Sequence, residues 1–182
     1  MDFSMEEITL HEAKYLRLKA LGRWEYAERT NADSAVIIVA VTPEDKILFV
    51  EQYRYPVQAK SIEMPAGLVG DLAPGESLDA AALRELEEET GWQAERVEYL
   101  MAGPSSSGMS NEMIAFVRAH GLCKVGPGGG DESEAIIVHE IPRNEAARWL
   151  HQKMSEGYSI DPKLYAGLYF VDFNPDGSAV PR

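Results

Sequence analysis

Arg84-Glu85-Leu86-Glu87-Glu88-Glu89-Thr90-Gly91-Trp92 carries the strongest structural signal in the chain. It closes a segment that we expect to be a helix over residues 77–90. Ser77 can cap the N-terminus of this helix, and Gly91 stands where a C′ glycine belongs. The segments on either side are therefore interpreted relative to an acidic helix near the middle of the chain.

The acidic residues of this helix are not spread evenly around it. Glu85, Glu88 and Glu89 share one face at helical spacing, whereas Glu87 points elsewhere. Glu88 and Glu89 also fall in the last turn, where the helix dipole disfavours negative charge. A solvated acidic surface is one interpretation. The other is a compensating cation, and carboxylate oxygens suit Mg²⁺ or Mn²⁺.

Length and charge narrow the classes of function. The chain has 182 residues, and 17 Lys and Arg against 30 Asp and Glu give a formal net charge of −13. This length predicts one domain with room for a small appendage. The acidic balance disfavours a nucleic acid held through its phosphates. It still allows a small phosphate substrate whose charge is met by metal ions.

The sequence also predicts a compartment. The longest apolar run, residues 35–41, is far shorter than the roughly 20 residues that span a bilayer. The acidic N-terminus does not resemble a signal peptide. Cys123 is the lone cysteine, so no intrachain disulfide can form, and we expect it to be a small buried residue. These features predict a cytoplasmic protein without a membrane partner.

Strands and helices are interspersed without a regular βαβ repeat, which predicts a mixed α/β fold. We expect residues 34–53 to form a β-hairpin around the turn at 43–45. Further helices are expected over residues 144–156 and from 161 toward 173, and a frayed tail from 174. The remaining strands are expected over residues 14–22, 24–30, 61–67, 97–101, 113–119 and 135–141.

The spacing around the acidic helix resembles the signature of the Nudix hydrolases, position for position. Trp92 is the one departure, because a smaller aliphatic residue is more usual there. The match runs through Gly70, Glu76, Arg84-Glu85-Leu86, Glu88-Glu89 and Gly91-Trp92.

The resemblance implies a fold and a set of roles. The expected fold is an α/β/α sandwich with a mixed sheet and an N-terminal β extension. In this family the signature forms a loop–helix–loop whose glutamates hold Mg²⁺ against a diphosphate. Metal roles are thus implied for Glu85, Glu88 and Glu89. A structural ion pair is implied between Glu76 and Arg84.

The flanking segments resemble one branch of the family, the ADP-ribose pyrophosphatases and nucleoside diphosphate sugar hydrolases. By this resemblance the Ala66 backbone carbonyl is a metal ligand. Arg54 is expected near the substrate's phosphates, and Gln52 and Glu112 are further substrate-binding candidates. An ordinary surface role for Arg54 and a turn-capping role for Glu112 are the alternatives. The segments are residues 51–56, 63–67, 103–112 and 131–134.

The proton acceptor is expected to be Glu132. It follows the glycine-rich residues 126–130, which we interpret as a linker or a lid that closes on the substrate. Glu134 is the alternative, as base or outer metal ligand, and Asp131 and Glu140 are weaker substitutes. The glutamates of the signature are poor candidates, because a carboxylate that coordinates Mg²⁺ is a weakened base.

Together these features predict an enzyme that hydrolyses a nucleoside diphosphate sugar, such as ADP-ribose or GDP-mannose. The alternatives are a sensor of nucleotide sugars without catalysis and an enzyme for another nucleoside diphosphate derivative. Residues 1–33 are expected to form the β extension and, by the resemblance, to hold a homodimer together. The Nudix domain is expected over 34–174 and a flexible tail over 175–182.

Overall fold

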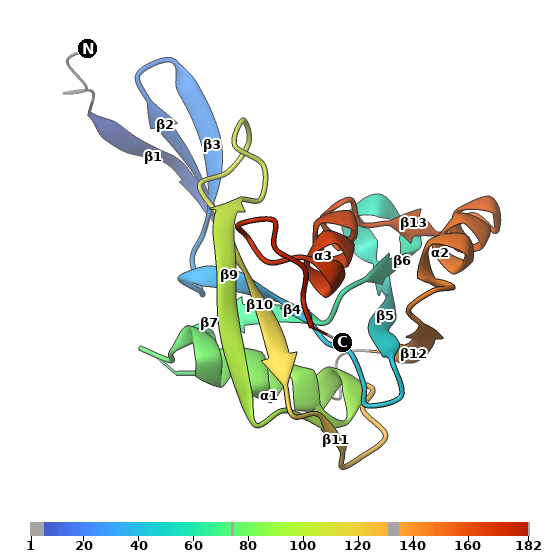
Figure 1. Ribbon diagram of the computed structural model, residues 1–182. Coiled ribbons are helices and arrows are strands. Elements are labelled where there is room, and N and C mark those ends of the chain that lie inside the picture. Colours follow the sequence, from blue (N-terminus) through green and yellow to red (C-terminus); the bar gives the residue numbers. More distant parts are fainter. Residues whose placement is uncertain (1–5, 74, 131–134, 182) are drawn as a thin grey trace.

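The computed structural model describes residues 6–73, 75–130 and 135–181. Its N-terminal part is a three-stranded antiparallel sheet of β1 (Glu7–Glu12), β2 (Leu16–Leu21) and β3 (Trp24–Arg29). This sheet projects from the main body of the molecule (Figure 1). The expected β extension is therefore a separate small sheet rather than a continuation of the main sheets.

The main body contains two four-stranded sheets. One has the order β7-β4-β10-β9, and β4 and β10 run parallel in it. The other has the order β12-β5-β6-β13. Their strands are β4 (Ser34–Val39), β5 (Lys46–Arg54), β6 (Ala59–Glu63), β7 (Ala66–Val69), β9 (Arg96–Pro104), β10 (Met113–His120), β12 (Ile137–Pro142) and β13 (Ser159–Ile160). Two short strands, β8 (Trp92–Gln93) and β11 (Cys123–Lys124), pair with each other in a separate two-stranded sheet, and η1 (Tyr55–Val57) is a short 3-10 helix.

Helices cover both faces of the sheet at β4. Successive side chains of a strand point to opposite faces, so those of β4 alternate between two hydrophobic cores. Ile37 and Val39 belong to the core that includes residues of α2 (Ala146–Ser155) and α3 (Lys163–Asp172). Val36 and Ile38 belong to the core that includes residues of α1 (Leu78–Thr90). This layering is visible in Figure 1, and the mixed α/β fold expected from the sequence is confirmed.

The acidic helix forms where the sequence places it. Ser77 caps α1 by accepting a hydrogen bond from the backbone N–H of Ala80 at 3.2 Å, and Gly91 ends the helix with a φ of 70°. Ala81, Ala82 and Leu86 are buried against the sheet. The apolar stripe therefore faces inward, with Glu89 also buried, whereas Glu87 and Glu88 are exposed.

Two strand predictions hold only in part: the hairpin over residues 34–53 pairs next to its turn, through Val41 and Ile47, and the strand over 61–67 is interrupted. The turn between β4 and β5 exists, with a hydrogen bond from Thr42 N–H to the Lys46 carbonyl at 2.8 Å, but the strands continue into different sheets. Both edges of β4 are already paired with β7 and β10. The single strand expected over 61–67 is divided into β6 and β7, on either side of Pro65, which has no N–H for a ladder.

Two further segments differ from their expected surroundings. Cys123, which was expected to be buried, is exposed on β11, a strand that pairs with β8 over two residues. The segment after α3 turns back toward the helix, with hydrogen bonds from Asn174 N–H to the Ser178 carbonyl and from Val180 N–H to the Asp172 carbonyl, both at 2.8 Å. Among the described residues, no helix is long and apolar enough to cross a bilayer.

Candidate active site

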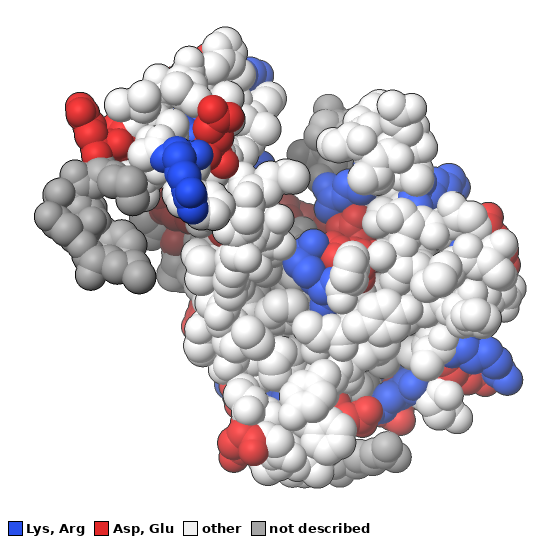
Figure 2. Space-filling model, turned by 90° about the horizontal axis from the view of Figure 1, so that it is seen from above, with Lys and Arg blue, Asp and Glu red and all other residues white. Residues whose placement is uncertain are grey.

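A groove of about 620 Å³ brings together segments that are far apart in the sequence. Charged side chains of both signs lie in the hollow between the part that carries the N-terminal sheet and the rest of the molecule (Figure 2). The lining includes Arg29 of β3, Gln52 and Arg54 of β5, Glu63 of β6, Ala66 and Gly67 of β7, Glu85 and Glu89 of α1, Glu112, and Asp161 and Lys163 at the start of α3.

Two carboxylates of α1 lie in this groove beside β7. Glu89 is buried, with 3% of its surface exposed, and its Oε2 accepts a hydrogen bond from the Ala66 N–H at 3.0 Å. The side chain of Glu85 occupies the space that a side chain at position 67 would fill. A Cβ built on Gly67 would lie 2.0 Å from Glu85 Cδ. Gly67 thus makes room for the carboxylate.

Burial raises the pKa of Glu85 to about 7, against the opposing influence of the Arg84 guanidinium, which donates to Glu85 Oε1 at 2.8 Å. A buried carboxylate is costly in its charged form unless a cation or hydrogen bonds compensate the charge. A divalent cation beside Glu85 would favour the charged form.

Glu88 lies outside the groove. Its side chain is 46% exposed and pairs with Arg84 Nη1 at 3.2 Å, and it lines a separate hollow next to Gly126–Gly128. The structure therefore brings Ala66, Glu85 and Glu89 together and leaves Glu88 beside them. Within the part of the chain that the structure describes, no three His, Cys, Asp or Glu side chains are grouped so that they could hold a metal ion by themselves. Two carboxylates and the backbone oxygen of Ala66 would supply an all-oxygen donor set, which suits Mg²⁺.

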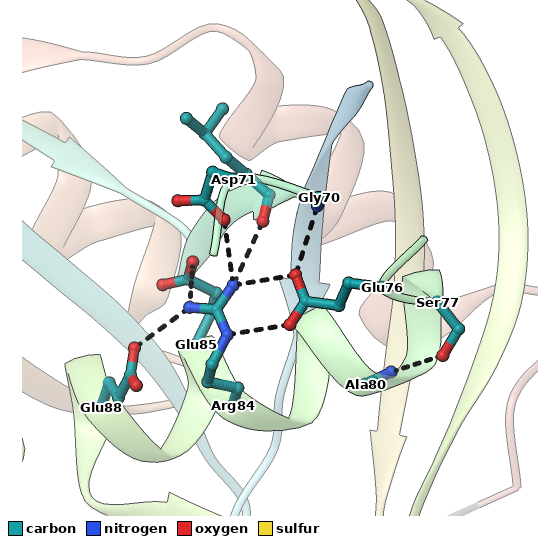
Figure 3. A network of polar contacts seen from close by, with 9 residues as sticks. Gly70, Asp71, Glu76, Ser77, Ala80, Arg84, Glu85 and Glu88 are labelled. Atoms are coloured by element: carbon teal, nitrogen blue, oxygen red, sulfur yellow. Dashed lines mark hydrogen bonds and ion pairs between the residues drawn. The ribbon is translucent and has the colours of Figure 1, made fainter. Parts of the chain in front are cut away.

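Arg84, in the middle of α1, connects the helix to the loop before it (Figure 3). Its Nε and Nη2 contact the two oxygens of Glu76 at 3.0 and 3.3 Å, and Glu76 Oε2 also accepts the Gly70 N–H at 3.2 Å. Arg84 further contacts the Leu68 carbonyl at 3.3 Å and Asp71 at 3.4 Å. The ion pair expected between Glu76 and Arg84 is confirmed.

The glycine-rich segment contacts the other end of α1. Gly129 N–H donates to the Glu89 carbonyl at 2.8 Å, and Gly130 N–H donates to the Glu88 carbonyl at 3.0 Å. Residues 126–130 were expected to form a linker or a lid. In the structure this segment packs against the last turn of the helix that carries the carboxylates.

Arg54 is held in the groove by a carboxylate that the sequence analysis did not assign to the site. Its Nε and Nη2 donate to the two oxygens of Glu63 at 2.8 and 2.6 Å. Burial alone would raise the pKa of Glu63, but the Arg54 guanidinium holds it below its usual range. This two-point pair orients Arg54 while 45% of its side chain stays exposed. Gln52 lies two residues earlier on β5 and lines the same groove.

Glu112 also lines the groove, where it pairs with Arg29 of the N-terminal sheet. Arg29 Nε donates to Glu112 Oε1 at 2.9 Å. Sequence reasoning missed Arg29, Asp161 and Lys163 as groove residues, together with Glu63. Glu63 is a neighbour of Arg54 only because β5 pairs with β6, and the sequence does not specify that pairing. No local pattern links Arg29 to residues more than 80 positions away.

Of the predicted proton acceptors, only Glu140 lies within the described residues. Glu132 and Glu134 lie outside the described residues, as does Asp131. Glu140 accepts hydrogen bonds from Trp92 Nε1 and Lys124 Nζ, each at 3.1 Å, and it does not line the groove. Glu140 is therefore already engaged on another part of the surface.

Comparisons with known proteins agree with this arrangement. The model of the NUDIX domain family matches residues 31–158. The methanol dehydrogenase activator of Bacillus methanolicus is 38% identical over 133 residues, which cover 72% of this chain and 70% of that protein. The ADP-ribose pyrophosphatase of Bacillus subtilis (strain 168) is 33% identical over 133 residues, with the same shares of 72% and 70%.

A third relative and a solved structure extend the comparison. The ADP-ribose pyrophosphatase of Mycobacterium tuberculosis is 35% identical over 149 residues, or 81% of this chain and 69% of that protein. The crystal structure of an ADP compounds hydrolase matches with a TM-score of 0.64 and 22% identity, covering 79% of this chain and 80% of that chain. This last likeness shows the shared fold. The chain belongs to the Nudix hydrolase family.

Proposed function

We propose that the protein hydrolyses the diphosphate bond of a nucleoside diphosphate sugar, such as ADP-ribose, to a nucleoside monophosphate and a sugar phosphate. The observation that carries this proposal is the shared groove. Glu85, Glu89 and the backbone of Ala66 line the same groove as the oriented cation Arg54. A diphosphate needs both kinds of group, because its oxygens carry charge that a guanidinium and metal ions can neutralise.

Each side chain of the groove has a role in this proposal. Arg54, braced by Glu63, contacts the phosphates and fixes their position. Gln52 and Glu112 supply a hydrogen-bonding amide and carboxylate for the polar parts of the substrate. Holding the diphosphate in this way supports an in-line attack by water, because correct positioning lowers the barrier of the reaction.

Mg²⁺, with Mn²⁺ as a substitute, is the proposed cofactor. Glu85, Glu89 and the Ala66 carbonyl would hold it, with Glu88, the residue before Glu89, as a further ligand. When bound, the metal supplies charge neutralisation of the phosphate oxygens and a lower pKa for the attacking water. Oxygen donors of this kind suit a hard cation.

Glu132 is the proposed proton acceptor, and Glu134 is the alternative on the same segment. The proposal is supported by the position of this segment in the sequence, directly after glycines whose backbone contacts the carbonyls of Glu88 and Glu89. A general base must come within hydrogen-bonding reach of the water or be linked to it through another water.

Three relatives support ADP-ribose or a related sugar as the substrate. Two of them are ADP-ribose pyrophosphatases and the third is an ADP-sugar pyrophosphatase. A GDP-mannose pyrophosphatase of Yersinia enterocolitica is 30% identical over 146 residues, so GDP-mannose is a reasonable second candidate. Turnover of a panel of nucleotide sugars with Mg²⁺, with the products identified, tests the proposal. A panel in which no member is cleaved would contradict it.

A cytoplasmic homodimer is the proposed state of the protein. The small N-terminal sheet supports the dimer, because every residue of β1 is exposed and Ile8, Leu10 and Trp24 leave large apolar surfaces uncovered. A second copy could bury this surface. Light scattering should give twice the mass of one chain, and a monomer mass at micromolar concentration would contradict the dimer.

A further inference from the structure

The last turn of α1 and residues 128–130 are in unusually close backbone contact. Besides the two hydrogen bonds to the carbonyls of Glu88 and Glu89, Gly128 itself lies directly on the helix end. A Cβ at this position would stand 2.4 Å from the Thr90 carbonyl carbon and 2.5 Å from the Glu89 carbonyl oxygen. These obstacles are backbone atoms, which cannot swing aside as a side chain can. We call residues 128–130 the glycine clasp.

The glycine clasp occupies carbonyls that a helix cannot satisfy by itself. The last four carbonyls of an α-helix have no intrahelical donor and need partners from elsewhere. Here the donors are the N–H groups of Gly129 and Gly130. Lys124 Nζ adds a contact to the Thr90 carbonyl at 3.1 Å. These donors also offset the negative end of the helix dipole, beside which Glu88 and Glu89 carry their own charge.

The two residues whose carbonyls the clasp holds are also residues whose carboxylates belong to the proposed metal site. A hydrogen bond to a residue's carbonyl restrains the adjoining peptide plane and thereby helps to orient its Cα–Cβ bond. For Glu89 a second constraint acts at the other end of the side chain, where Oε2 accepts the Ala66 N–H. Glu89 is thus held between β7 on one side and the clasp on the other.

We propose that the glycine clasp positions the carboxylates of Glu88 and Glu89, with Gly128 as its essential positioning residue. Gly128 meets two requirements at once: its φ is 69°, and there is no room for a Cβ. Glycine adopts this conformation without the steric penalty of other residues. The proposal rests on the proposed function only in treating these carboxylates as metal ligands.

The test compares Gly128→Ala with two matched glycine variants. Gly157, just after α2, has a φ of 91° but no atom within 4 Å of an added Cβ. Gly157→Ala therefore introduces the conformational strain alone. Gly126 also has no atom within 4 Å of an added Cβ and does not have a positive φ, so Gly126→Ala introduces neither effect. Mn²⁺ affinity is measured by titration of the purified proteins, and Tm is measured in EDTA.

We expect Gly128→Ala to raise the Kd for Mn²⁺ by about 10- to 100-fold, the range found when residues that orient metal ligands are changed. Gly157→Ala should lower Tm, because alanine is strained at a positive φ. It should leave the Kd within about twofold, because Gly157 follows α2 and the carboxylates lie on α1. A folded Gly128→Ala protein with the wild-type Kd would overturn the proposal. If wild type itself binds no Mn²⁺, the proposed metal site fails instead.

Two additions keep the test decisive if Gly128→Ala does not fold. Gly128→Asn restores compatibility with positive φ, because Asn adopts this region more readily, while it keeps the added Cβ. Amide hydrogen exchange of the wild-type protein needs no variant. The N–H groups of Gly129 and Gly130 should be protected to the same degree as those in the last turn of α1. Exchange at the rate of an unstructured chain would overturn the proposal.

Discussion

The two ends of α1 are attached to the rest of the protein in different ways. At the N-terminal part, Arg84 and Glu76 form a charged side-chain pair that also reaches the backbone of Gly70 (Figure 3). At the C-terminal end, the glycine clasp contacts the carbonyls of Glu88 and Glu89 through backbone N–H groups. The first attachment is an ion pair between side chains. The second requires glycine, because a side chain at position 128 would collide with the helix backbone. Glu85 directly follows Arg84 and contacts it, and Glu89 is one of the residues that the clasp holds.

The largest expected effect comes from the carboxylates themselves. Glu89→Gln or Glu85→Gln should reduce kcat by about 10³-fold or more, because a metal ion contributes several kcal/mol of transition-state stabilisation. Glu87→Gln is the matched control on the same helix, since Glu87 bonds Gln93 outside the groove. Steady-state kinetics with Mg²⁺ measure the effect. Activity that survives both substitutions would remove Glu85 and Glu89 from the metal site.

The next effect concerns the segment after the glycine clasp. Glu132→Gln should lower kcat by about 10²- to 10⁴-fold, the usual range for loss of a general base, and leave Mn²⁺ affinity largely intact. Single-turnover kinetics separate the chemical step from binding. If Glu134→Gln shows this loss and Glu132→Gln does not, the base has been assigned to the wrong residue.

Gly67→Ala tests the space beside Glu85 without changing any charge. The added Cβ would displace the Glu85 carboxylate, whose Cδ lies 2.0 Å from it. Because a misplacement of about 1 Å can reduce a rate by about 10²-fold, we expect a loss of that order with little change in Tm. Gly103→Ala on β9 is the control, since its nearest contact is an ordinary 3.7 Å. A folded Gly67→Ala protein with the wild-type kcat would show that the position of the Glu85 carboxylate beside Gly67 does not matter for catalysis.

The smallest effect on activity is expected at the charged attachment. Glu76→Gln should reduce the free energy of unfolding by about 1–3 kcal/mol at neutral pH, since it weakens a hydrogen bond between charged groups. The Arg84 hydrogen bond lowers the pKa of Glu76 below its ordinary 4.5. The stabilisation is thus present above pH 4.5 and is lost as the pH falls through the lower folded value. Denaturant unfolding should show wild type and variant converging in acid. A constant difference down to pH 2 would argue against the ion pair.

This contrast explains how far the sequence could predict the site. The pair of Glu76 and Arg84 was predictable because side-chain charge and spacing are visible in the sequence. The glycine clasp was not, because its contacts use backbone N–H groups that every residue except proline has. Residues 126–130 therefore suggested a linker or a lid, although they pack against α1.

The fold shows the same limit. Periodicity and capping signals predicted α1 and most strands, but they could not show which strands become neighbours. The turn at residues 43–45 suggested a hairpin, whereas pairing with β7 and β10 places β4 in a different sheet from β5. Arg54 was expected to contact phosphates, but its two-point contact with Glu63 depends on the pairing of β5 with β6.

The central claim is that the groove hydrolyses a nucleoside diphosphate sugar with the help of a divalent metal. The most direct test is wild-type hydrolysis of ADP-ribose, with products identified, before EDTA treatment, after it, and after Mg²⁺ is restored. The account predicts AMP and ribose 5-phosphate in equal amounts, loss of turnover in EDTA, and recovery with Mg²⁺. Unchanged turnover in EDTA, or cleavage at a bond other than the diphosphate, would contradict it.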